Sequence, residues 1–224
     1  MNKRITLRKV FLWFCLVLFL FCLVFFSEFI YLYTKKPEIL LPKIPLLKSW
    51  FYLTTGNLDK SIENLDKSAN FFIEKNQTFY PEVIFDSDVS SGLAGVNDTM
   101  KSEVANLLKG FLPQAILVSY SSIVSNIYYM MGMIAYENGS NDYAKDFFQT
   151  AVYLNPTLSL LHVELANLYL NQGLVDKADE VINYCMRFQS PSQHCREFRE
   201  ANFYPPFLHK PGFLKDDVRN NLFY

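Results

Sequence analysis

Two consecutive stretches of 34 residues decide the fold of this chain. Residues 125–158 read SNIYYMMGMIAYENGSNDYAKDFFQTAVYLNPTL, and residues 159–192 read SLLHVELANLYLNQGLVDKADEVINYCMRFQSPS. A period of this length indicates one structural unit used twice. The positions that recur are small, apolar or turn-forming: Gly132 with Ala166, Gly139 with Gly173, Asp142 with Asp176, Ala144 with Ala178, Phe148 with Ile182, and Ala151 with Cys185.

Each unit is predicted to be a helix, a tight turn and a second helix. Gly139 and Gly173 suit the left-handed residue at which the first helix ends. Asp142 and Asp176 then lie in the first turn of the second helix, where the helix dipole favours an acid. Pro156 ends the first unit because proline cannot continue a helix.

This pattern resembles the tetratricopeptide repeat, which has the same period and a similar spacing of small and aromatic residues. Tyr169 matches the aromatic position of the family's first helix, whereas Tyr128 and His162 replace its usual tryptophan. The resemblance implies an all-α chain, a short TPR-like α-solenoid of helix-turn-helix repeats. It also implies a protein-binding scaffold rather than an enzyme.

Other parts of the chain are assigned around these two units. Residues 34–79 are predicted to be a degenerate unit, since Tyr52, Gly56 and Asp59 keep the spacing of Tyr169, Gly173 and Asp176. Residues 80–124 are predicted to hold an irregular insert followed by a helix or helix pair broken near Pro113. Residues 159–191 form the last unit. Residues 192–224 are predicted to be a capping helix and an extended tail.

The N-terminal region indicates a membrane anchor. After a basic segment at residues 1–9, residues 10–33 are almost entirely apolar, and an uncleaved transmembrane helix, or signal anchor, is expected there. A cleaved signal peptide is the alternative, but Phe25, Phe26 and Glu28 stand where its small residues belong. A charge-free stretch from Gly110 to Tyr136 is the candidate for a second span, although its second half already belongs to a repeat.

The orientation of this anchor is nearly balanced. Four Lys and Arg precede the apolar run and four Lys follow it, and the tighter cluster before the run favours a cytoplasmic N-terminus. The C-terminal domain is then extracytoplasmic. That domain carries a net charge of about −4, because four of the chain's 21 basic residues and one of its 22 acidic residues precede it. An acidic domain argues against a nucleic-acid partner.

Catalytic, cofactor and metal sites are not indicated. The chain has three histidines and eight glycines, and no nucleophile or phosphate-binding motif. Cys185 and Cys195 follow one another across a helix–turn–helix boundary and are candidates for a disulfide, which suits an oxidising compartment. Two independent thiols are the alternative. His162 is expected to be a packing residue.

The resemblance implies a concave groove lined by the first helix of each unit. Carried onto this chain, the groove residues are Asn126, Tyr129, Met133, Tyr136, Leu160, Val163, Asn167, Leu170 and Asn171. This apolar and amide surface suits an amphipathic or extended apolar segment of a partner protein. The alternative is that these residues pack under the helix predicted between Met100 and Val124. The expected function is a single-pass membrane-anchored scaffold or adaptor; a permanent structural subunit of a membrane complex and an enzyme accessory domain are the alternatives.

Overall fold

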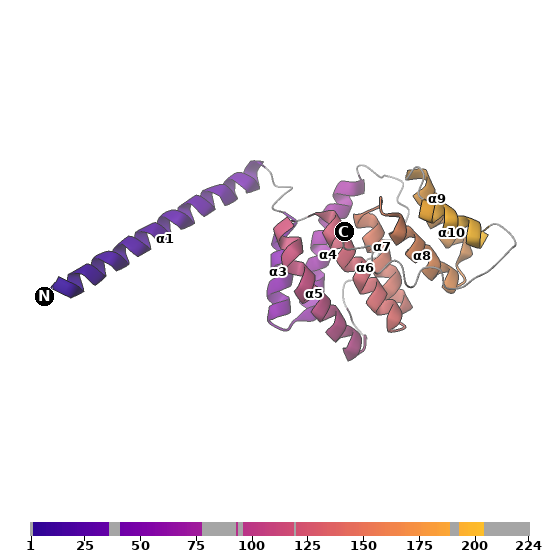
Figure 1. The fold of residues 1–224 in the computed structure, drawn as a ribbon, viewed down its shortest axis with the longest axis horizontal. Helices are drawn as coiled ribbons and strands as arrows, with labels where there is room; N and C mark the ends of the chain where they lie inside the picture. The colour runs from indigo at the N-terminus through magenta and orange to yellow at the C-terminus, as the bar shows by residue number, and fades with distance from the viewer. Residues whose placement is uncertain are drawn as a thin grey trace.

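The computed structural model describes residues 2–35, 41–77, 93, 96–118, 120–188 and 193–203, and these residues contain helices and no strand. The helices are α1 (Asn2–Lys35), α3 (Lys43–Thr54), α4 (Leu58–Gln77), α5 (Asp98–Val118), α6 (Ser121–Glu137), α7 (Asn141–Leu154), α8 (Ser159–Asn171), α9 (Val175–Phe188) and α10 (Gln193–Phe203). Figure 1 shows α3 to α10 following one another as a packed array, with α1 extending away from it. The all-α prediction is therefore confirmed for the described residues.

Three helical hairpins share one turn geometry. The turns between α3 and α4, α6 and α7, and α8 and α9 each contain a glycine with positive φ: Gly56 at 82°, Gly139 at 74° and Gly173 at 75°. In each turn, the N–H of the residue after the glycine donates to the carbonyl five residues earlier, at 2.8 Å: Asn57 to Tyr52, Ser140 to Ala135, and Leu174 to Tyr169. This is the Schellman arrangement that ends a helix.

Close packing within the second hairpin depends on Gly132. A Cβ atom added to Gly132 would lie 2.5 Å from two ring carbons of Phe148 on α7. The small residue therefore lets the aromatic ring of the paired helix contact the α6 backbone.

α5 lies between the first two hairpins. It packs against both α3 and α6, whereas α4 packs directly against α7. Its Met100, Val104, Leu108 and Leu112 are completely buried. α5 is also in contact with α6, but the alternative that the predicted groove residues pack under this helix stays a prediction.

The predicted break near Pro113 is wrong. α5 runs without interruption from Asp98 to Val118 with Pro113 inside it. Proline removes one N–H donor from a helix and leaves the carbonyl four residues earlier without its usual partner. That carbonyl belongs to Lys109, an exposed residue, so solvent can take the place of the missing donor. Buried residues on either side of Pro113 hold the helix together.

A buried polar contact joins the first hairpin to the second. The hydroxyl of Tyr128 on α6 donates to Oδ1 of Asp66 on α4. Tyr128 is completely buried and Asp66 is 6 % exposed. Burial raises the pKa of Asp66 to about 6, against the lowering effect of the Tyr128 hydrogen bond. The contact spans 62 positions of sequence, and it links two hairpins that are joined by the insert and α5.

α1 exposes apolar side chains on every side. Over residues 13–24 each side chain is exposed, including Trp13 at 68 % and Phe14 at 63 %. Within the described part of the chain, however, no helix combines the length and hydropathy needed to cross a membrane. The single-pass anchor predicted over residues 10–33 is therefore not supported by the described residues.

Some sequence predictions concern residues that the structure does not describe. The irregular insert falls mostly on residues 78–92, and the extended tail on residues 204–224, both outside the described ranges. The capping helix predicted from residue 192 corresponds to α10, which begins at Gln193 and ends at Phe203.

Candidate protein-binding face

The first helices of the second and third hairpins, α6 and α8, carry all nine residues predicted to line a groove. We call these nine residues the α6/α8 face. A direct hydrogen bond connects the two helices at this face: Nδ2 of Asn171 donates to the hydroxyl of Tyr136 at 3.1 Å. Both residues are exposed. The side chains at the C-terminal ends of α6 and α8 thus meet, and both helices pack against α7.

Burial divides the face into two groups. Tyr129 and Val163 are 5 % and 1 % exposed and belong to the hydrophobic core. The Tyr129 ring lies 5.8 Å from the Phe148 ring, so it packs within its own hairpin. Asn126, Met133, Leu160, Asn167 and Leu170 are half-buried, and Tyr136 and Asn171 are exposed. The structure leaves seven of the nine side chains accessible to a partner.

The accessible part of the face is apolar with interspersed amides. Met133, Leu160 and Leu170 supply apolar surface, and each is half-buried. Asn126 and Asn167 supply amide groups, which can donate to and accept from a peptide backbone. Such a surface combines hydrophobic burial with hydrogen bonds that fix the register of an extended chain.

Glu164 was missed by sequence reasoning. It is a half-buried residue of α8, one turn from both Leu160 and Asn167, so it lies on the same side of the helix. Burial raises the pKa of its carboxyl group. The signal was present in the sequence, because Glu164 is the sole charged residue of α8.

Buried hydrogen bonds hold both helices against α7. The hydroxyl of Ser125 on α6 donates to the carbonyl of Ala151 at 2.8 Å. Nε2 of Gln149 on α7 donates to the hydroxyl of Tyr169 on α8 at 2.6 Å. Buried hydrogen bonds of this kind restrict how neighbouring helices slide. The two helices of the α6/α8 face are consequently both attached to α7.

His162 is a buried packing residue, as the sequence predicted. Its Nδ1 lies 3.2 Å from the carbonyl oxygen of Leu158, which assigns the proton to Nδ1. The ring is stacked on Tyr184 with centroids 5.7 Å apart. Burial lowers the pKa of His162 to about 4, so the ring is neutral at pH 7. Among the described residues, Nε2 has no hydrogen-bond partner.

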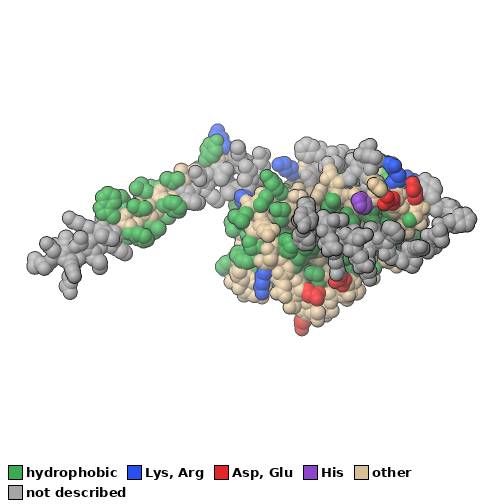
Figure 2. Space-filling view, in the orientation of Figure 1, with side chains coloured by type: hydrophobic (Ala, Val, Ile, Leu, Met, Phe, Trp, Pro, Cys, Tyr) green, Lys and Arg blue, Asp and Glu red, His purple; other side chains and the backbone are tan. Residues whose placement is uncertain are grey.

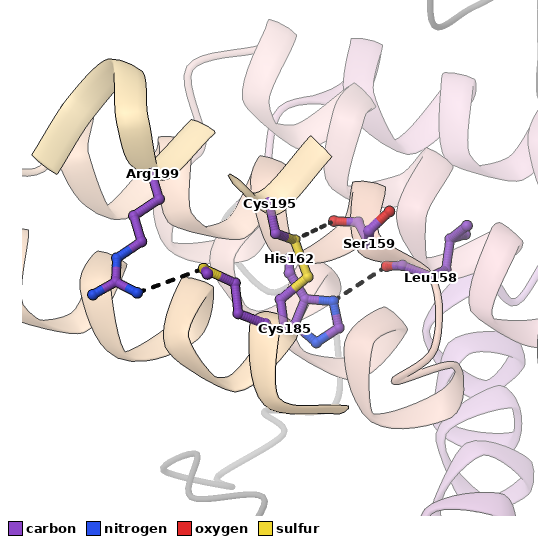
Figure 3. The surroundings of a disulfide bond; sticks show 7 residues. Leu158, Ser159, His162, Cys185, Cys195 and Arg199 are labelled. Carbon is purple, nitrogen blue, oxygen red and sulfur yellow. Dashed lines mark hydrogen bonds between the residues drawn. A yellow bond between two sulfur atoms is a disulfide. The ribbon is translucent and has the colours of Figure 1, made fainter. Parts of the chain in front are cut away.

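A disulfide joins α9 to the terminal helix α10. It connects Cys185 and Cys195, which are both completely buried. Figure 3 shows His162 of α8 beside this bond, and Cys195 Sγ lies 3.6 Å from the carbonyl oxygen of Ser159. Nη1 of Arg199 lies 3.6 Å from the sulfur of Met186 and adds a second α9–α10 contact. The C-terminal end of the array is therefore closed by a covalently attached helix.

The described residues offer no metal site, since no three of their His, Cys, Asp and Glu side chains gather closely enough to hold an ion. What the structure does offer is a partly apolar face on two repeated hairpins. Its chemistry suits recognition of a peptide segment.

Comparison with known proteins supports this view of the repeats. Residues 125–158, the segment of α6 and α7, match the model of the tetratricopeptide repeat. The chain is also 25 % identical over 127 residues to "Uncharacterized protein ycf37" of Pyropia yezoensis, which covers 54 % of this chain and 69 % of that protein. The similarities support a tetratricopeptide-repeat protein, and such repeats are generally scaffolds for protein–protein interaction.

Proposed function

We propose that this protein is a non-enzymatic scaffold whose α6/α8 face binds an amphipathic or extended apolar segment of a partner protein. The observation that carries the proposal is the set of half-buried apolar and amide side chains on two helices that both pack against α7. Met133 and Leu170 provide the apolar contact, and Asn167 provides backbone hydrogen bonds. Contacts of this type give a peptide both affinity and register.

Site-specific photocrosslinking in the full-length protein tests the proposal. A photoreactive residue at Asn167 is expected to crosslink a defined partner in cells, whereas the same residue at the exposed Asn70 of α4 is not. The double variant Met133→Glu, Leu170→Glu is expected to lose the Asn167 crosslink, since a partner's apolar segment would then meet two charges. Circular dichroism of the purified variant checks that its helices remain intact.

The alternative functions give a different result. If the Asn70 and Asn167 positions crosslink the same partner, and the double variant retains it, the α6/α8 face is not the contact surface. The protein is then held through other surfaces, as a permanent structural subunit would be. Degradation of the protein when it is expressed without its complex would favour that alternative further.

A second proposal concerns α1, which we infer holds the protein in a lipid bilayer as a single-pass anchor. Its support is the exposure of all twelve side chains over residues 13–24, together with the unbroken apolar sequence from Val10 to Phe26. A span needs roughly 20 residues, and the apolar sequence of residues 10–33 supplies that length. The N-terminus would be cytoplasmic, and the disulfide-bearing domain would lie in an oxidising compartment.

Alkaline carbonate extraction of native membranes tests this anchor. The full-length protein is expected in the pellet, and a Leu18→Arg, Phe21→Arg variant in the supernatant, because each charge near the bilayer centre costs about 3 kcal/mol. Protection of the C-terminal domain from trypsin added to the cytoplasmic side checks the topology. Release of the wild-type protein by carbonate would refute the anchor.

A further inference from the structure

An open hollow of about 530 Å³ lies on the first hairpin, between α3 and α4. Apolar residues of α3 and lysines of both helices line it. We call the hollow and its rim the α3/α4 surface; the lining residues used below are Leu47, Lys48, Phe51, Lys60, Glu63 and Lys67. It belongs to helices other than those of the α6/α8 face. Neither the repeat pattern nor the family resemblance predicts it.

The apolar part of this surface is open to solvent. Leu47 is 52 % exposed and Phe51 is 61 % exposed. The two residues are four positions apart on α3, so their side chains lie next to each other on one side of the helix. In Figure 2, hydrophobic side chains gather along the α3 edge of the domain. Exposed apolar groups rimmed by charged residues are typical of an interaction site.

The charged part of the surface is positive. Its three lysines, Lys48, Lys60 and Lys67, are all exposed. Glu63 is the acid among the lining residues, and it forms an ion pair with Lys67 at 2.6 Å. The side-chain hydrogen bond from Lys67 lowers the pKa of Glu63, so the pair is charged at neutral pH. Two positive charges are left over, on a domain whose own net charge is negative.

The chain itself keeps this surface close to α1. α1 ends at Lys35 and α3 begins at Lys43. Eight residue steps reach about 28 Å when fully extended. The α3/α4 surface therefore remains within a short distance of the end of the apolar helix α1. Any bilayer that takes up α1 presents its headgroups to α3.

We propose that the α3/α4 surface docks onto the anionic headgroups of a lipid bilayer. This inference rests on the proposed anchoring by α1. Phe51 and Leu47 enter the interfacial region, and Lys48 and Lys60, the two lysines outside the Lys67–Glu63 ion pair, contact headgroup phosphates. Each lysine near an anionic surface contributes about a fivefold increase in the docked-to-undocked ratio. Charge complementarity and the short tether select the bilayer over an acidic protein segment or a second copy of the chain.

Docking is measured with a tryptophan reporter in the full-length protein. The chain has two tryptophans, so a Trp13→Phe, Trp50→Phe background with Phe51→Trp gives one reporter in the surface. The protein is reconstituted into vesicles of phosphatidylcholine, or of phosphatidylcholine with phosphatidylglycerol, that carry brominated acyl chains. With phosphatidylglycerol, the reporter emission is expected to shift to shorter wavelength and to lose most of its intensity by bromine quenching.

Matched variants separate docking from unfolding and from general lipid contact. Leu174→Trp on the same background places the reporter in the α8–α9 turn, where Leu174 is 42 % exposed, and should remain unquenched in both vesicles. Lys48→Glu with Lys60→Glu should abolish the quenching at position 51 and leave the helical circular dichroism unchanged. High salt should have the same effect, since 1 M salt reduces the screening length to about 3 Å.

Three results would overturn the proposal. Equal quenching of the Phe51→Trp reporter in both vesicle types would mean that the lysines do not select anionic lipid. A concentration-dependent shift without vesicles would mean that a second copy covers the surface. A shift on addition of an acidic peptide but not of anionic vesicles would assign the surface to a protein partner.

The result also distinguishes docking from anchoring. Flotation of the wild-type protein with phosphatidylcholine vesicles, combined with an unquenched reporter in anionic vesicles, refutes docking and leaves the α1 anchor standing. Flotation with anionic vesicles alone, combined with a quenched reporter, refutes the anchor and leaves docking standing. Absence of flotation with either vesicle refutes both.

Discussion

At the residue scale, the contact between Gly132 and Phe148 predicts how a larger residue at position 132 changes stability. Gly132→Ala is expected to lower the free energy of unfolding by about 1–3 kcal/mol, because the new methyl group would overlap the Phe148 ring and force it to move. Gly110→Ala is the matched control. No atom lies within 4 Å of a Cβ at Gly110 in α5, so the higher helix propensity of alanine should stabilise the protein by about 0.5–1 kcal/mol. Urea denaturation measures both. Equal effects at the two positions would contradict the packing argument.

The raised pKa of Asp66 predicts how the free energy of unfolding depends on pH. Its pKa rises from 3.8 to about 6 because burial disfavours the carboxylate. Between those values the folded protein binds more protons than the unfolded chain, so the stability contributed by the neutral acid is lost as pH rises towards 6. The loss amounts to about 3 kcal/mol. Asp66→Asn has no charge to desolvate and keeps an acceptor for Tyr128. The variant's stability relative to wild type should therefore increase by about 2 kcal/mol between pH 4 and pH 7.

Titration of His162 changes stability with pH in the opposite direction to that of Asp66. The pH dependence of wild type must therefore be compared with that of Asp66→Asn. Burial lowers its pKa from 6.5 to about 4, so the unfolded chain binds more protons between those values and stability rises with pH there. The two slopes nearly cancel in the wild-type protein. Denaturant unfolding of wild type and Asp66→Asn at matched pH isolates the Asp66 contribution, and a difference independent of pH would show that this carboxyl is not desolvated.

At the element scale, the terminal helix α10 depends on its covalent link to α9. Cys185→Ala with Cys195→Ala removes a bond across ten positions of sequence, and is expected to cost about 3 kcal/mol in the chain-entropy description. Hydrogen exchange should show faster opening of α10 and of the end of α9. Exchange in α6 and α7 should change little. Uniform acceleration in every helix would mean that α10 is no separate unit.

The sequence predicted those features that depend on residues close together in the chain. The turns at Gly139 and Gly173 follow from local backbone preference, and the need for a small residue at position 132 follows from its recurrence as Ala166. The contact of Gly132 with Phe148 is known from the structure alone. The continuity of α5 through Pro113 could not be predicted, because it depends on burial against α3 and α6, which lie far apart in the chain. The burial of Tyr129 and Val163 within the α6/α8 face could not be predicted for the same reason. The spacing of residues tells which side of a helix they lie on, but their exposure depends on the helices packed against that side.

The α3/α4 surface escaped sequence reasoning for a related reason. Its lysines come from two helices, and their separation in sequence gives no periodic pattern that stands out from an ordinary solvated face. Only the hairpin brings Lys48 and Lys60 to the rim of one hollow. Glu164 was also missed, but it could have been found from the sequence, because it is the sole charged residue of its helix.

At the scale of the whole molecule, α5 joins the hairpins into a single core. Buried residues form one cluster from Leu46 on α3 to Phe198 on α10. Leu108→Ala in α5 removes a completely buried side chain and is expected to lower the free energy of unfolding by about 2–5 kcal/mol. Because α5 contacts both sides, hydrogen exchange should accelerate in α3 and in α6 alike. An effect confined to α5 would show that the hairpins are independently stable.

Leu117→Ala is the control for that prediction. Leu117 lies on the same helix but is 77 % exposed, so its loss should change the free energy of unfolding by no more than about 0.5 kcal/mol. If both leucines behave alike, the measured effect reflects helix propensity in α5 rather than the joint core.

The hydrogen bond between Asp66 and Tyr128 also sets an order of events on the ribosome. The two residues are 62 positions apart, and at about 5–20 residues per second the later one emerges about 3–12 s after the earlier. During that interval the α3–α4 hairpin leaves the exit tunnel, but Tyr128, the partner of the Asp66 carboxyl group, has not yet emerged. The nascent hairpin must keep Asp66 in contact with water. It closes over that residue only when α6 has arrived.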